Sequence, residues 1–294
     1  MEWVLFSILA VIIWSVVNIV DKYVLTKWIE KPVIPTMILG VVGLAASFIV
    51  YLTQGFSELS FSNILLAFLA GLLYVLMSLL YYKSVQLEEI SRITPLFHFT
   101  PIFILILASI FLGEIFTPIK YVGIFLLLIG AILITTKKIK KFSFGKAVWL
   151  MLLASLAMAI NQIITKYLLG FAGFWTVFSW IRIGAFIFLI PVYFIYWPRF
   201  AALTKKHGKK VIAIVSLNES INILGVIFIT MAASVGYITL VNALSSIQPV
   251  FVFIFTIFLS IFYPKIIKEE INKSTLLLKS TAIILMILGV IIIS

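Results

Sequence analysis

The chain has 294 residues, of which 64% are apolar and only 11% carry a charge. A soluble domain is about half apolar and a quarter charged, so this composition excludes a soluble enzyme, a disordered chain and a collagen-like chain. The net charge of +12 would suggest a nucleic-acid partner in a soluble protein, whereas here it indicates one face of a membrane and no nucleic acid.

Ten apolar segments follow one another along the chain, and each is long enough to cross a bilayer as a helix. They cover residues 3–25, 33–53, 62–84, 93–112, 118–136, 147–168, 174–196, 210–232, 238–263 and 275–293. Backbone polar groups must be paired inside lipid, and the alternating pattern of barrel strands is absent. We therefore predict an all-α integral membrane protein with ten transmembrane helices, the first a span and not a signal peptide.

Three short sequence matches recur in the same order in the two halves of the chain. Residues 21–25 (DKYVL) match residues 165–169 (TKYLL), and residues 100–106 (TPIFILI) match residues 248–254 (QPVFVFI). The fifth and tenth segments share a glycine in an apolar run. Apolar helices also resemble one another by composition alone. If the matches mark an internal repeat, they predict two five-helix halves, 1–141 and 142–294. Because five is odd, the second half crosses the membrane in the opposite direction, which makes the repeat inverted, as in secondary transporters.

Lysine and arginine gather in the connections that follow the odd-numbered segments. The run from Lys137 to Lys141 and the run from Lys205 to Lys210 are examples, whereas the even-numbered connections and the termini hold at most Lys120 and Lys166. Short cytoplasmic loops carry the basic excess in membrane proteins. We expect a multi-pass protein of the plasma membrane (a prokaryotic inner or cell membrane), with these connections in the cytoplasm and both termini outside.

Two ionisable residues lie well inside predicted spans, where a charge is costly unless it faces a cavity or a partner. Arg182 is in the seventh segment and Glu219 is in the eighth, which runs the other way. We predict that they form an ion pair or share a water-filled cavity. In the functional interpretation Glu219 binds a proton or cation and Arg182 holds an anionic substrate group. In the structural one they are a buried pair that fixes two helices.

Other polar side chains inside the spans are candidates for lining a substrate path. Asn18 occupies a place in the repeat that corresponds to Asn161 and Gln162, although such amides equally serve as hydrogen bonds between helices. His98 lies between two prolines and could act as a gate. The predicted substrate-binding set is Asn18, Tyr74, Ser78, His98, Asn161, Gln162, Arg182, Asn218, Glu219, Asn222, Asn242, Ser245, Ser246 and Gln248.

Motifs of catalysis and of cofactor binding are missing from the sequence. It has no cysteine, only two histidines, no His/Glu cluster at metal-ligand spacing and no glycine-rich phosphate loop. We therefore expect no enzyme activity, no metal and no cofactor. The expected partners are a small-molecule substrate, membrane lipids and, through a gradient, protons, and the sequence leaves the oligomeric state open.

The fourth segment carries Pro101 and ends in Leu112, Gly113 and Glu114, and the first ends in a polar-then-lysine pattern around Lys22. With ten short-looped spans, the chain resembles the EamA-type branch of the drug/metabolite transporter superfamily. The resemblance implies export or exchange of small metabolites, here amino-acid-like or drug-like solutes, by alternating access. A flippase for a lipid-linked sugar is the alternative from the same superfamily.

The sequence departs from that family in two respects. The second half lacks a counterpart of Leu-Gly-Glu, since the matching place reads Leu259, Ser260, Ile261. Family members usually have both termini in the cytoplasm, whereas the charge distribution here points outward. We expect Glu114, near Pro118 at the end of a span, to be a surface group at a helix end, and the resemblance implies a structural role as the alternative.

Overall fold

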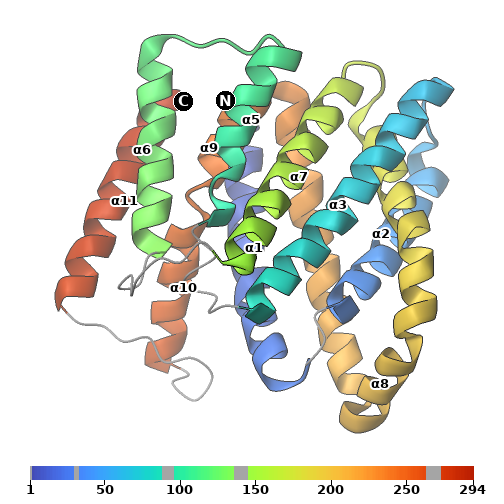
Figure 1. Ribbon diagram of the computed structural model, residues 1–294. Helices are drawn as coiled ribbons and strands as arrows, with labels where there is room; N and C mark the ends of the chain where they lie inside the picture. The colour runs from blue at the N-terminus through green and yellow to red at the C-terminus, as the bar shows by residue number, and fades with distance from the viewer. Residues whose placement is uncertain (1, 30–32, 88–95, 136–144, 263–272) are drawn as a thin grey trace.

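The computed structural model describes residues 2–29, 33–87, 96–135, 145–262 and 273–294. Within these ranges the regular structure is α-helical, which confirms the predicted all-α fold. The helices are α1 (Glu2–Lys27), α2 (Val33–Gln54), α3 (Phe61–Leu87), α5 (Thr100–Phe111), α6 (Pro118–Thr135), α7 (Lys146–Leu168), α8 (Phe174–Val235), α9 (Ile238–Ser245), α10 (Gln248–Phe262) and α11 (Lys273–Ile293). They form an elongated bundle with both termini at one end (Figure 1).

Eight helical stretches in the described ranges are long and apolar enough to cross a membrane, and two shorter apolar helices accompany them. The 62-residue helix α8 contributes two of these stretches, Phe174–Lys206 and Gly208–Val235. It folds back on itself at Gly208, whose φ of 76° and ψ of 176° suit glycine and hardly any other residue. The chain is therefore a multi-pass membrane protein, and the seventh and eighth predicted spans run antiparallel through one sharp turn.

Two predicted spans are interrupted or shortened. The ninth, predicted as one helix over 238–263, consists of α9 and α10 with a break at Ser246 and Ile247. In the fourth, Leu96 and Phe97 are helical, a turn follows at His98 and Phe99, and α5 begins at Thr100, whereas residues 93–95 of the prediction lie outside the described ranges. Pro101 and Pro249 are each the second residue of the helix after the irregular stretch. Proline lacks an N–H and clashes with the preceding turn, so a helix starts at it more easily than it continues through it.

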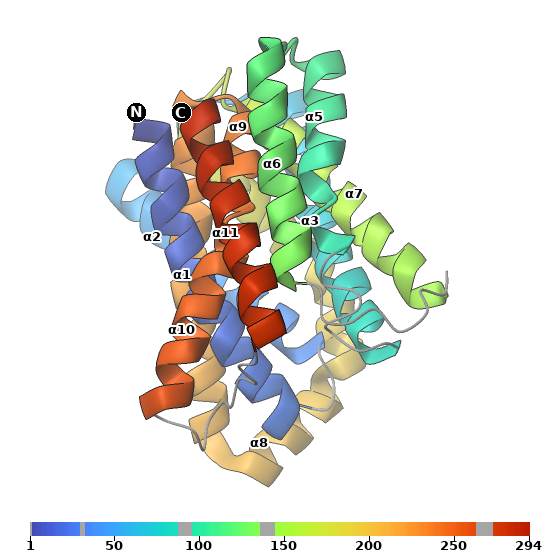
Figure 2. The same cartoon turned by 90° about the vertical axis from the view of Figure 1, so that its left-hand side faces the viewer.

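Glycines bring α3 and the first half of α8 into direct backbone contact. A Cβ atom on Gly71 would lie 2.6 Å from the Ile181 carbonyl oxygen, and one on Gly184 would lie 2.7 Å from the Cα of Phe68. Small residues at helix interfaces are typical of membrane proteins, where close packing replaces the hydrophobic effect as the attraction between helices. This contact fixes the position of Arg182 relative to α3. Figure 2 gives the same bundle from the side.

Substitution of Gly71 by alanine is expected to lower the free energy of unfolding by about 1–3 kcal/mol, since the added methyl group has only backbone to displace. Thermal unfolding in detergent, followed by loss of the monodisperse peak, measures the effect. The control is Leu69→Ala on the same helix, where the side chain is 42% exposed and little stability should be lost. Equal stability of the Gly71 variant and the control would contradict the proposed close contact.

Candidate functional site

Arg182 lies inside the bundle on the first half of α8 and is only 5% exposed. Its guanidinium carbon is 4.2 Å from the centre of the Tyr74 ring of α3 and 5.8 Å from that of Phe178. Cation–π contact with a desolvated arginine is worth about 2 kcal/mol and keeps the charge in place without neutralising it. The Nε atom of Arg182 is buried and has no hydrogen-bond partner.

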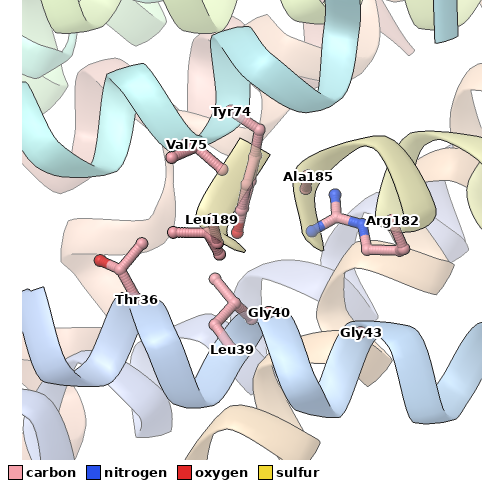
Figure 3. A pocket seen from close by; sticks show the side chains of 9 residues that line it. All are labelled: Thr36, Leu39, Gly40, Gly43, Tyr74, Val75, Arg182, Ala185 and Leu189. Carbon is pink, nitrogen blue, oxygen red and sulfur yellow. The ribbon is translucent and has the colours of Figure 1, made fainter. Parts of the chain in front are cut away.

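A small pocket lies beside this guanidinium (Figure 3). Tyr74 enters it from α3, Arg182 from α8 and Thr36 from α2. The Thr36 hydroxyl is also buried without a hydrogen-bond partner. Gly43 makes room for the arginine, because a Cβ atom there would lie 3.1 Å from Arg182 Cδ. Two lining residues of one pocket thus carry a polar atom with unused hydrogen-bonding capacity, although the Thr36 oxygen points away from the guanidinium in Figure 3.

Carboxyl and amide groups gather on the second half of α8 and on α1. Glu219 is 3% exposed, and its Oε2 accepts a hydrogen bond from the Asn222 amide at 3.0 Å. One turn away, the Asn218 amide donates to Asp21 Oδ1 at 2.7 Å. Asp21 and Glu219 lie within electrostatic range of one another. Two acidic side chains and two amides therefore share one region of the bundle interior.

Tyrosines of α3 connect the arginine with the acidic group. The Tyr74 phenol lies close to Arg182 and to Asn222, and it is within electrostatic range of Glu219. Tyr82, two turns further along α3, is within electrostatic range of both Asp21 and Glu219. The site is thus a polar patch with a cation at one side, carboxyl groups at the other and phenol groups between them.

The sequence prediction for Arg182 and Glu219 offered an ion pair or a shared cavity. In the described part of the chain no ion pair joins the two residues: Glu219 is bonded to Asn222, and Arg182 stacks on Tyr74. The two residues are instead linked indirectly, since Tyr74 contacts both Arg182 and Asn222, and Asn222 bonds to Glu219. The structure brings together five of the predicted site residues, namely Tyr74, Arg182, Asn218, Glu219 and Asn222.

Several predicted site residues instead form hydrogen bonds within or between helices. The Asn161 amide donates to the Ala70 carbonyl at 2.7 Å and so connects α7 with α3. Ser78, Asn242, Ser245 and Ser246 bond to carbonyl groups of their own helices or the adjoining turn. The carbonyl of Gln248 accepts a bond from Ser15 at 3.3 Å. Of these contacts, only the Asn161 bond is the helix-to-helix hydrogen bond that the sequence offered as an alternative for the amides.

Three further predicted residues lie apart from these contacts, each in a different setting. Asn18 is exposed on α1, and Gln162 is buried in α7. His98 precedes α5, and its Nε2 is buried without a hydrogen-bond partner.

The predicted site set contained neither Thr36 nor Asp21. Thr36 follows a proline in an apolar segment, and the glycines at 40 and 43 of that segment were the available signal of a close approach. The surface expectation for Glu114 is wrong, since this residue is 3% exposed, and its contacts fit the structural role instead. Its partners are backbone N–H groups of α9, which lies far from it in the sequence.

Comparisons with known proteins agree with the predicted family resemblance and with the helical fold. Residues 1–136 match the model of the EamA-like transporter family, which confirms the predicted resemblance. A crystal structure of a protein 15% identical in sequence superposes with a TM-score of 0.74, covering 99% of this chain and 95% of that one. At this identity the likeness concerns the fold alone. No curated protein matches the sequence.

Proposed function

We propose, from the match of residues 1–136 to the EamA-like transporter family, that the protein is a secondary transporter of small organic metabolites. The protein exports or exchanges amino-acid-like solutes by alternating access. The single observation that carries the substrate class is the buried Arg182 guanidinium, which faces a pocket with no carboxylate bonded to it.

A buried arginine whose Nε has no hydrogen-bond partner favours an anionic ligand. Its planar guanidinium can give two parallel hydrogen bonds to a carboxylate, and a buried charge is costly until such a partner arrives. The Arg182 side of the site therefore suits the carboxylate of a small solute.

The opposite side of the site favours a cation. Asp21 and Glu219 are two carboxyl groups in electrostatic range of one another, and each accepts a hydrogen bond from an asparagine amide. An ammonium group of the solute, or a proton, would relieve the repulsion between them. A zwitterion with both charges on a short skeleton fits this division of charge better than a neutral drug does.

Alternating access follows from the two predicted five-helix halves, 1–141 and 142–294, rocking about the site. We place the protein in a plasma membrane with the basic connections in the cytoplasm and both termini outside. Glu219 couples the movement to a proton gradient, because its carboxyl group can accept a proton in one access state and lose it in the other.

Reconstitution into proteoliposomes tests the proposal. Zwitterionic amino acids, organic anions, organic cations and neutral drugs are offered under an imposed pH gradient, after a thermal-shift screen of the same compounds. Saturable uptake of a zwitterion that raises the unfolding temperature supports the assignment. Movement of a lipid-linked sugar between leaflets, with no solute uptake, would favour the flippase alternative and overturn it.

A further inference from the structure

Glu114 follows a left-handed turn at the end of α5. The helix ends at Leu112, whose N–H donates to the Ala108 carbonyl at 2.9 Å, and Gly113 has a φ of 67°. The N–H of Glu114 then bonds back to Ala108 at 3.2 Å. A left-handed glycine after a helix is a common way to stop it. The turn directs the Glu114 side chain away from α5.

The Glu114 carboxylate binds the start of α9. Oε1 accepts the N–H of Ile238 at 2.9 Å, and Oε2 accepts the N–H of Thr239 at 3.0 Å. The first N–H groups of a helix have no partners within it, and the positive end of the helix dipole favours a negative charge there. A buried acid from the connection between α5 and α6 thus supplies the cap of α9.

Lys166 holds the other side of the same junction. It lies in the last turn of α7, and its ammonium group donates to the carbonyl oxygens of Ala233 and Gly236, both at 2.7 Å. These carbonyls belong to the end of α8. Glu114 and Lys166, which we call the α8–α9 clamp, therefore hold the short junction between α8 and α9 from both sides.

The clamp lies at the end of the bundle where both termini are located (Figures 1 and 2). Directly beside it, apolar side chains of α5, α7, α8 and α9 form a buried cluster. Its buried members are Ile104, Ala108, Ala159, Ile163, Ala233 and Ile238. This end of the bundle is closed between α5 of the predicted first half and the helices of the predicted second half.

The two members of the clamp differ in what they connect. Lys166 joins α7 to α8, which are both in residues 142–294, whereas Glu114 joins α5 to α9 across the two predicted halves. We propose that Glu114 is a latch that keeps the terminal end of the transporter closed, and that opening toward that side requires its release from α9. The inference rests on the alternating access of the proposed function.

The test uses single cysteines as reporters, because the chain contains no cysteine of its own. Ala159→Cys places a thiol under α5 in the apolar cluster, and Ser84→Cys places one in a second buried location, where Ser84 bonds to the Ala147 carbonyl near the start of α7. The rate of reaction with a small methanethiosulfonate reagent is measured on purified protein. In Glu114→Gln, one acceptor oxygen and the charge are lost, and we expect labelling at position 159 to become about tenfold faster. Labelling at position 84 should stay within about twofold.

Lys166→Met is the matched control, since it removes hydrogen bonds at the same junction but inside one predicted half. Its labelling at position 159 should stay within about twofold of the parent. No acceleration at position 159 in Glu114→Gln, or equal acceleration at positions 159 and 84, would overturn the latch. If that variant does not fold, Glu114→Asp, whose carboxylate is one methylene shorter, takes the same test. The readout needs no substrate, so a failed substrate assignment leaves this result interpretable.

Discussion

Replacement of Arg182 by methionine is expected to abolish solute uptake while leaving the fold intact. Methionine is similar in length and can pack against Tyr74, so the pocket stays filled, and removal of an unpaired buried charge should not lower stability. Loss of two charge-assisted hydrogen bonds to a carboxylate corresponds to about 100-fold weaker binding. Arg182→Lys keeps the charge but loses the planar geometry, and about tenfold weaker binding is expected.

Ligand-induced thermal shift and uptake in proteoliposomes measure both arginine variants. Arg199→Met is the matched control, because Arg199 also lies over a tyrosine ring, 4.8 Å from the centre of Tyr196, but is exposed at the helix surface. Its uptake should equal that of the parent protein. Unchanged uptake in Arg182→Met would remove the anion from the proposed substrate class.

Replacement of Glu219 by glutamine is expected to separate transport from its energy source. The amide keeps the size of the side chain and can still bond to Asn222, but it cannot exchange a proton. A gradient of one pH unit supports about tenfold accumulation through one coupled proton. In the variant this accumulation should fall to the level measured without a gradient, whereas exchange of labelled for unlabelled solute should stay within about twofold.

Accumulation and exchange are compared in the same vesicles, with Glu58→Gln as the control. Glu58 lies exposed in the connection between α2 and α3, so loss of its charge should change neither rate. Accumulation in Glu219→Gln that still follows the pH gradient would show that another group carries the proton. Loss of both activities would instead assign Glu219 to substrate binding.

The contrast between Arg182 and Asn161 shows how far polar residues could be sorted from the sequence. Both stand out as polar side chains in apolar segments. Only the contacts between helices show that the Asn161 amide bonds to the Ala70 carbonyl, whereas Arg182 Nε has no partner. The two residues lie in similarly apolar segments, and they differ in whether a polar group of another helix lies within hydrogen-bond distance. Glu114 shows the converse, because proximity to a proline gave no sign of the N–H groups more than 120 residues later.

The sequence by itself determined the environment and the class of fold. A chain that is 64% apolar can satisfy its backbone in lipid only through helices or a closed barrel, and runs of about 20 apolar residues without alternation leave helices. The inverted repeat and the orientation in the membrane, which also come from the sequence, stay predictions. Tertiary structure alone decided that Tyr74 and Asn222 link Arg182 indirectly to Glu219, that Asp21 joins the acidic group, and that Glu114 caps α9. Such partners come from helices distant in the chain, and their pairing depends on packing that local composition does not encode.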